Sequence, residues 1–280
     1  MIEGAAMSQH NERIRFENVS KVFDTDNGSI QVAEDVSFGV GDGEFVSLVG
    51  PSGCGKTTML NMVAGFMQPT TGSVLLDGNP IQGPGSERGM MFQDYGVFPW
   101  LSVEDNIAFG LRLRANRVSE ARRKEIVDHF VELMGLTEFR RAYPKTLSGG
   151  MRQRLALARS YAVNPEFLLM DEPFGALDAQ TRTAMQDLLL NVMGEVRKTV
   201  MLITHSVEEA LYLSSRILVI SARPSRIRRI IEVPFGFPRT AELRDSAAFA
   251  DLRSEVRELV MQEYAAQESQ ARQKQTTGQA

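Results

Sequence analysis

Short apolar runs and helix-spaced apolar residues alternate along most of this 280-residue chain. Apolar runs closed by polar or turn-forming residues predict buried strands. Segments with apolar residues every three or four positions follow several of these runs, and they predict helices that cover a sheet. The alternation indicates an α/β fold with a mostly parallel sheet core. The expected strands of this core are 44–49, 89–92, 167–170, 199–203, 216–220 and 227–233.

Two stretches depart from this alternation. Residues 14–19 and 30–38 alternate apolar and polar positions, which predicts half-buried antiparallel strands joined by a turn near Gly28. Between about residues 94 and 160 the pattern is mostly helical, and it is clearest at 119–134. We therefore expect an antiparallel β subdomain and a helical insert subdomain beside the parallel core.

The two ends of the chain differ from the middle. Residues 1–13 are mostly polar and are expected to be disordered, which leaves 14–240 as the main domain. In 241–280, apolar residues at helical spacing up to Val260 predict one amphipathic helix. The polar, Gln-rich residues 267–280 then predict a flexible tail.

The most informative motif lies between an expected parallel strand and the helix that follows it. Residues 50–58 read Gly-Pro-Ser-Gly-Cys-Gly-Lys-Thr-Thr, which fits the pattern of a phosphate-binding loop. Glycines let the backbone wrap around an anion, and the amides of the loop bind phosphate oxygens. Lys56 would reach the terminal phosphates of a nucleoside triphosphate, and the Thr57 hydroxyl would hold Mg²⁺. A glycine-rich turn with a surface lysine is the alternative, and the flanking strand and helix argue against it. The expected nucleotide contacts are Gly50, Pro51, Ser52, Gly53, Cys54, Gly55, Lys56, Thr57 and Thr58.

Polar side chains directly follow other apolar runs. Asp171 and Glu172 end one run, His205 follows a second, and Gln93 follows a third. Because ligands bind at the carboxyl edge of a parallel sheet, these groups should lie beside the phosphate loop. One carboxylate can then hold Mg²⁺, and the other can orient and deprotonate an attacking water. A solvated acidic turn is the alternative for the carboxylate pair.

Composition excludes several classes of protein. The net charge of −4 gives no basic footprint for nucleic acid. The single cysteine excludes an internal disulfide and a multi-cysteine metal site. No apolar run is as long as a membrane span, and the N-terminus lacks the pattern of a secretion signal. We therefore expect a cytoplasmic chain that binds no nucleic acid and needs a separate partner for any role at a membrane.

Cys54 carries an expectation of its own. It lies in the phosphate loop near a helix N-terminus and a lysine, and both conditions lower the pKa of a thiol. If this thiol is reactive, alkylation should inhibit activity, and bound MgATP should protect the thiol from alkylation. The alternative is a small residue that only fills space.

The motifs, in their order along the chain, resemble those of the ATPase subunits of ABC transporters. Leu147-Ser148-Gly149-Gly150-Met151 matches the signature of this family, and Gly175-Ala176-Leu177-Asp178 matches another of its loops. The resemblance covers about residues 14–235. It implies a P-loop (RecA-like) core, ATP and Mg²⁺ as cofactors, and ATP hydrolysis coupled to transmembrane transport.

The same resemblance implies roles for single residues. Phe23 would stack on adenine, and Gln93 would sense Mg²⁺ and the γ-phosphate. Glu172 would be the general base, and His205 would contact the γ-phosphate. The implied catalytic set is Glu172, His205, Lys56 and Gln93, and the implied metal set is Thr57, Gln93 and Asp171.

Partners are implied as well. Ser148, Gly149 and Gly150 begin a helix whose amides and dipole attract anions. The resemblance implies that these three residues and Asp178 contact nucleotide. We expect the helical insert to carry this helix away from the chain's own phosphate loop. In the family it meets ATP bound to a second subunit, head to tail. The resemblance therefore implies a dimer of the chain at the cytoplasmic face of the membrane, with transmembrane permease subunits and an extracytoplasmic solute-binding protein.

Two further stretches, 98–106 and 219–224, resemble the importer branch for nitrate, sulfonates, taurine and related small solutes. The apolar loop at 97–101 would help to receive a coupling helix from the permease, because exposed apolar residues of this kind mark interaction sites. A loop packed into the core is the alternative. The competing functions are an ABC exporter subunit, a soluble ABC-type ATPase acting on nucleic acid or ribosomes, and a non-hydrolysing nucleotide-binding module.

Overall fold

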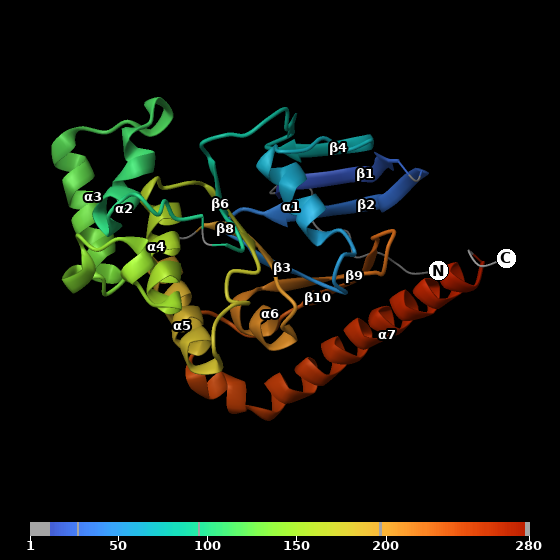
Figure 1. The fold of residues 1–280 in the computed structure, drawn as a ribbon. Coiled ribbons are helices and arrows are strands. Elements are labelled where there is room, and N and C mark those ends of the chain that lie inside the picture. The colour runs from blue at the N-terminus through green and yellow to red at the C-terminus, as the bar shows by residue number, and fades with distance from the viewer. Residues whose placement is uncertain (1–11, 27, 95, 196–197, 278–280) are drawn as a thin grey trace.

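The computed structural model describes residues 12–26, 28–94, 96–195 and 198–277, and within them the chain forms two β-sheets. The larger sheet has the strand order β10-β9-β3-β8-β7-β6. Its strands run parallel except for β10, which is antiparallel to β9 (Figure 1). The expected α/β fold with a mostly parallel core is confirmed. The strands are β3 (Phe45–Val49), β6 (Arg88–Met91), β7 (Phe167–Asp171), β8 (Thr199–Ile203), β9 (Arg216–Ile220) and β10 (Ile227–Glu232).

Strands β3, β7, β8 and β9 are buried along their whole length, which explains their almost unbroken apolar sequences. Successive side chains point to opposite faces of a sheet, so each strand supplies two separate hydrophobic clusters. In β7, Leu168 and Met170 belong to one cluster, and Phe167 and Leu169 belong to the other. A slip of one residue would exchange the two faces, so burial fixes the register of the parallel strands.

The β subdomain is an antiparallel sheet in the order β2-β1-β4-β5. Its long hairpin begins at Glu12, inside the segment that was expected to be disordered, while residues 1–11 lie outside the described ones. Side chains of β1 and of helix α1 belong to the same hydrophobic cluster, which joins this sheet to the parallel core. The elements are β1 (Glu12–Thr25), β2 (Gly28–Gly41), α1 (Lys56–Ala64), β4 (Thr71–Leu76) and β5 (Asn79–Pro80).

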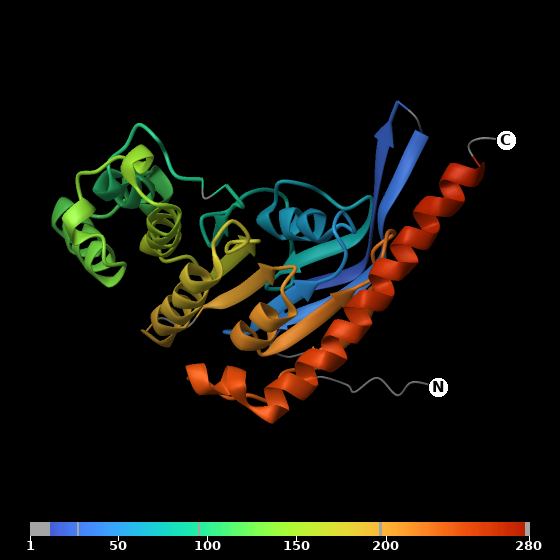
Figure 2. The ribbon, with the colours of Figure 1, turned by 60° about the horizontal axis from the view of Figure 1, so that its bottom comes forward.

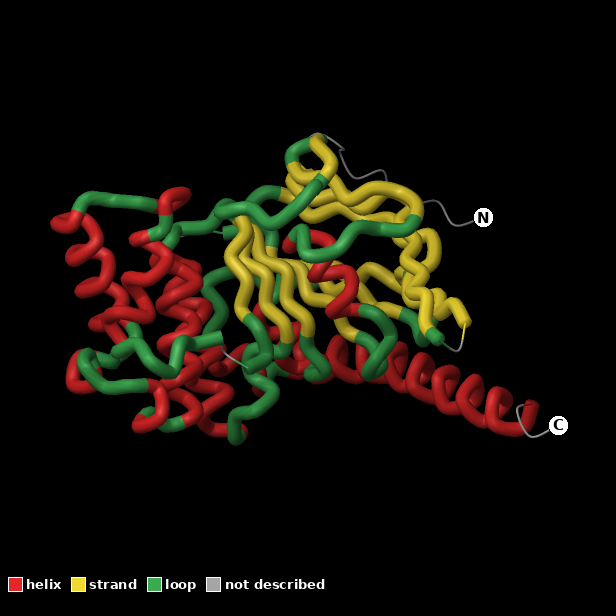
Figure 3. Tube along the Cα trace, turned by 45° about the horizontal axis from the view of Figure 1, so that its top comes forward, coloured by secondary structure: helices red, strands yellow, loops and turns green. Residues whose placement is uncertain are grey.

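The insert forms a helical lobe beside the sheets, at the end of the molecule opposite the β subdomain (Figures 1 and 3). Its main helices are α2 (Val103–Arg112), α3 (Glu120–Leu133) and α4 (Gly149–Ala162). Each begins after a serine whose hydroxyl accepts the N–H of the residue three positions later. Such N-caps typically contribute about 1 kcal/mol to helix stability.

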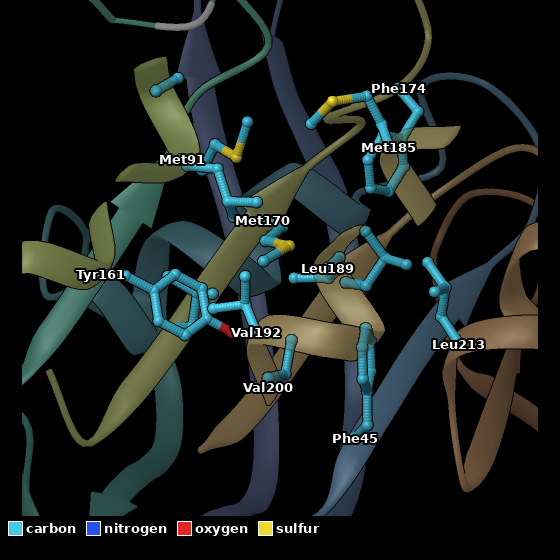
Figure 4. Packing of buried hydrophobic residues seen from close by; sticks show 14 of the residues in the cluster. Phe45, Met91, Tyr161, Met170, Phe174, Met185, Leu189, Val192, Val200 and Leu213 are labelled. Atoms are coloured by element: carbon cyan, nitrogen blue, oxygen red, sulfur yellow. The ribbon is translucent and has the colours of Figure 1, made fainter. Parts of the chain in front are cut away.

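Helices α5 (Ala179–Glu195) and α6 (Val207–Leu213) contribute to the larger hydrophobic cluster. Figure 4 shows Leu189 of α5 beside Met170 of β7, and Met185 of α5 beside Phe174. Fully burying side chains of this size contributes roughly 1.5–3 kcal/mol each. The interdigitated side chains therefore hold α5 against the strand that carries Asp171.

The last helix, α7 (Ala247–Thr277), crosses the face of the molecule along β9 and β10 and continues beyond them (Figure 2). Phe249 and Val256 are fully buried, so the first half of this helix packs against the core. The helix continues to Thr277, through the polar segment for which the sequence predicts a flexible tail. In the described part of the chain, no helix combines the length and the apolar character needed to cross a membrane.

Candidate active site

A cavity of about 560 Å³ lies at the carboxyl edge of the parallel sheet. It brings together groups that are far apart in the sequence: the phosphate loop, the polar residues that follow strands β6, β7 and β8, and the β1–β2 hairpin. Of the expected catalytic residues, Lys56, Gln93, Glu172 and His205 all line it. The full lining is Phe23, Ile30, Val32, Ser52, Gly53, Gly55, Lys56, Thr57, Thr58, Gln93, Glu172, His205 and Arg223.

The phosphate loop is shaped by its glycines and its lysine. Gly55 has a φ of 119°, and a Cβ atom added there would lie 2.8 Å from side-chain atoms of Val32 and Ser225. Glycine is therefore required at this position for both conformation and space. The buried ammonium of Lys56 donates to the carbonyl oxygens of Gly50 and Pro51 at 2.8 Å each, so it also closes the loop from inside.

The carboxylate pair occupies the adjacent strand end. Asp171 is hydrogen-bonded to the Thr57 side chain, and burial raises the pKa of its carboxyl above the usual value. Glu172 follows with a φ of 48°, a left-handed conformation that is uncommon for this residue type and is found at functional sites. Its Oε1 lies 2.5 Å from Nε2 of His205, and both side chains are partly exposed toward the cavity.

The groups around Asp171 fit a magnesium ion. Mg²⁺ prefers hard oxygen ligands, and in nucleotide sites it is typically held by one or two protein groups together with phosphate oxygens. Asp171 is a buried carboxylate that is hydrogen-bonded to the Thr57 hydroxyl, and burial raises its pKa more than that bond and the charges of Lys56 and His205 lower it. A divalent cation would compensate the negative charge of this carboxylate, with Thr57, Asp171 and the amide oxygen of Gln93 as protein ligands.

The opposite end of the cavity is apolar. Phe23 and Ile30 are paired across the β1–β2 hairpin, and Val32 lies on the same wall. The Nζ atom of Lys21 lies 5.1 Å from the centre of the Phe23 ring. The ring is half-buried and borders the open cavity, which is the arrangement that stacking on a planar base needs.

The signature residues do not line this cavity. Ser148 caps α4, and Gly149 and Gly150 form the first turn of that helix. Asp178 also lies outside it, where its exposed carboxylate caps α5 by accepting the N–H of Thr181 at 3.0 Å. The insert therefore separates the signature from the chain's own phosphate loop, as expected.

Cys54 is fully buried and belongs to the hydrophobic cluster shared by β1 and α1. Burial raises the pKa of its thiol, and this effect outweighs the opposing charge of Lys56. The expectation of an activated thiol is therefore wrong, because desolvation favours the neutral form. Its backbone N–H donates to the carbonyl oxygen of Pro51, and this bond helps to fix the shape of the phosphate loop.

We expect native Cys54 to react with iodoacetamide at pH 8 at least about 100-fold more slowly than in the unfolded chain, because only the exposed thiolate reacts. Mass spectrometry of the intact protein, sampled over time with and without guanidinium chloride, measures both rates. Equal rates in the two conditions would show that the thiol is accessible in the folded protein.

Sequence reasoning did not find Arg223. Its Nη2 atom donates to the carbonyl oxygen of Gly53 at 2.6 Å, and its side chain lines the cavity. The residue lies in the turn between β9 and β10, and nothing in its local pattern indicates that this turn folds back onto the phosphate loop. Ile30 could have been found from the pairing of the hairpin with Phe23.

Comparison with known proteins agrees with this geometry. Residues 33–175 match the family model described as ABC transporter. The nitrate import ATP-binding protein NrtD of Synechococcus elongatus is 44% identical over 90% of this chain and 93% of its own length. The taurine import ATP-binding protein TauB of Jannaschia sp. is 48% identical over 85% of this chain and 90% of its own length.

Solved structures show the same relationship. A dimeric structure of the ATP-binding cassette MJ0796, in a post-hydrolysis state bound to ADP and Pi, is 30% identical, with a TM-score of 0.69. The match covers 80% of this chain and all of that one. The chain therefore belongs to the ABC transporter family, as an ATP-binding subunit that hydrolyses ATP.

Proposed function

We propose that this chain is the ATPase of an importer for a small solute such as nitrate, a sulfonate or taurine. The observation that carries the proposal is the cavity in which the phosphate loop faces the Glu172–His205 pair. Two relatives, NrtD and TauB, are named for import of nitrate and taurine, and each aligns over most of its length. Both names favour import over export or a soluble role on nucleic acid or ribosomes.

The residues of the cavity divide the chemistry between them. The apolar wall with Phe23 would hold the base, and the loop amides with Lys56 would hold the phosphates. Glu172 would orient the attacking water and accept its proton, while His205 would position the carboxylate and contact the γ-phosphate. Bound Mg²⁺ would neutralise negative charge on the β- and γ-phosphate oxygens.

A second copy of the chain would complete the site. The amides at the start of α4 can bind an anion, yet Ser148, Gly149 and Gly150 lie outside the cavity of their own chain. In a head-to-tail dimer they would contact ATP held by the partner, and Asp178 would lie at the same interface. ATP would then hold the two copies together, and hydrolysis would release them.

The surface that would receive the permease is an aromatic patch made of Phe66, Phe92, Phe98 and Trp100. Phe66 stacks on Phe92, and Phe98 stacks on Trp100. Trp100 is 69% exposed, which argues against a loop packed into the core. Exposed aromatic groups in clusters mark interaction sites, and a permease helix is the partner that the proposed import function requires.

The loop that carries Phe98 and Trp100 is held by two side chains. Buried Asn106 accepts the N–H of Phe98, and it donates to the carbonyl oxygens of Phe98, Leu101 and Ser102 at 3.0–3.1 Å. Arg159, on helix α4, places its guanidinium 4.0 Å from the centre of the Phe98 ring. The same guanidinium donates to the carbonyl oxygen of Gly96.

Uptake of labelled nitrate, taurine and alkanesulfonates in a strain that lacks this chain tests the proposal. We expect the wild-type gene to restore uptake of one solute. Trp100→Ala should leave ATP hydrolysis by the purified chain within about twofold and lower uptake at least tenfold, since central aromatic anchors can contribute 2 kcal/mol or more at an interface. Met261→Ala changes an exposed apolar residue on α7 and should leave uptake unchanged.

Each outcome has a distinct meaning. Uptake that does not depend on the chain, with normal hydrolysis in vitro, would contradict the importer assignment and favour export. Normal uptake with Trp100→Ala would instead contradict the docking surface and leave the transport role intact.

A further inference from the structure

Helix α7 reaches the nucleotide cavity from outside. Its first half is fixed to the core by Phe249, Val256 and Val260. Tyr264 also packs against the hydrophobic cluster, and beyond it the helix continues as a mostly polar segment (Figure 2). Two polar side chains, Glu263 and Gln267, are spaced four residues apart and therefore lie on one face of the helix. Both contact other parts of the chain.

Glu263 attaches α7 to the turn between β9 and β10. Its Oε2 accepts the backbone N–H of Ala222 at 3.1 Å, and its Oε1 lies 3.3 Å from the Nε of Arg228. The Glu263 side chain is only 12% exposed, so these contacts are largely shielded from water. The turn that they hold contains Arg223, which donates to the carbonyl oxygen of Gly53.

Gln267 contacts the phosphate loop directly. Its Nε2 donates to the carbonyl oxygen of Ser52 at 3.0 Å. Its Oε1 is buried and has no hydrogen-bond partner within the described residues. The amide cannot simply be reversed, because its oxygen would then face the oxygen of Ser52. The bond to Ser52 is therefore the one hydrogen bond seen for this half-buried amide.

This bond orients a peptide group of the loop. A trans peptide is planar, and its C=O and N–H point in opposite directions. When Gln267 holds the carbonyl of Ser52 toward α7, the N–H of Gly53 is turned away from α7. Ser52 and Gly53 both line the cavity, and the amides of such a loop are the groups that bind phosphate.

We propose that Gln267 is a positioning residue for the phosphate loop, and that docking of the outer half of α7 is coupled to nucleotide binding. This inference rests on the proposed role of residues 50–58 as the phosphate site. By linkage, a helix that favours the binding-competent loop must itself be stabilised by bound nucleotide. The outer turns of α7 therefore belong to the nucleotide site although they do not line it.

Steady-state kinetics of the full-length chain test the positioning role. Gln267→Glu removes the donor and should raise the KM for ATP about three- to tenfold, while kcat stays within about twofold. Gln267→Ala should change KM in the same direction by a smaller factor. Gln270→Glu makes the same charge change at an exposed position one turn further along, and it should behave as wild type.

Amide hydrogen exchange with and without MgADP tests the coupling, and it distinguishes a failure of the coupling from a failure of the phosphate-site assignment. We expect MgADP to slow exchange in residues 50–58 and also in 261–270. Protection of the loop without protection of α7, together with a normal KM for Gln267→Glu, would overturn the role of Gln267 and leave the nucleotide site standing. An unprotected loop with MgADP bound would overturn the phosphate-site assignment itself.

A shortened chain that ends at Tyr264 gives an independent check. It retains Phe249, Val256, Val260 and Glu263, so the anchored half of α7 and its bond to Ala222 remain. We expect its KM for ATP to match that of Gln267→Ala, because both changes remove the donor to Ser52 without adding a carboxylate. A wild-type KM in a folded shortened chain would contradict the proposal.

Discussion

Replacing Glu172 with glutamine is expected to lower the rate of ATP hydrolysis by about 10²- to 10⁴-fold while MgATP binding is retained. Glutamine keeps the shape of the side chain and an oxygen that can face Nε2 of His205, which lies 2.5 Å from the carboxylate in the native chain. It removes the group that accepts the proton of water. It also removes a negative charge beside the phosphates, so binding should be equal or tighter.

Two measurements check this expectation. Phosphate release gives the rate, and size-exclusion chromatography with MgATP reports whether the variant accumulates as a dimer. Glu208→Gln makes the same chemical change at an exposed position on α6 and should hydrolyse ATP normally. Near-wild-type hydrolysis by Glu172→Gln would assign the general base to another residue.

The second large effect is expected at Lys56. The variant Lys56→Ala should bind MgATP at least about 100-fold more weakly, because charge-assisted hydrogen bonds contribute roughly 1.5–3 kcal/mol each. It should also be less stable without nucleotide. The ammonium is buried and bonds to the carbonyl oxygens of Gly50 and Pro51, and its loss leaves both without that donor.

Thermal unfolding separates these two effects. Wild-type protein should show a higher Tm with MgATP, because ligand that binds only the folded state stabilises it by mass action. Lys56→Ala should start from a lower Tm and gain almost nothing from MgATP. Lys145→Ala, at an exposed position in the helical lobe, should behave as wild type in both conditions. A normal nucleotide-induced shift in Lys56→Ala would argue against its contact with phosphate.

The parallel core was predictable because its strands are buried on both faces. Runs such as 199–203 then have to be apolar throughout, and the polar residue that ends each run marks the edge of the sheet. This logic predicts that Glu172 and His205 lie beside the phosphate loop, and both line the same cavity. The alternating pattern of residues 14–19 and 30–38 likewise predicts the hairpin, whose first strand extends beyond the predicted range and includes Phe23.

What the sequence did not reveal depends on polar contacts between distant segments. Gln267 continues a helix without an apolar stripe, and its contact with Ser52 leaves no periodic pattern. Arg223 reaches Gly53 only because the β9–β10 turn folds over the loop. For Cys54, the local motif correctly gave a lysine and a helix N-terminus, but tertiary burial outweighed both.

The aromatic patch has a further property that follows from its two supports. Asn106 bonds to four backbone groups of residues 98–102, and these bonds hold the loop in one shape within the single chain. Association then loses little conformational entropy from this side of the interface. Arg159 joins the same loop to α4, the helix that begins with the signature residues. We therefore expect a tilt of α4 to move residues 96–102 as well, because the guanidinium of Arg159 contacts both Gly96 and the ring of Phe98.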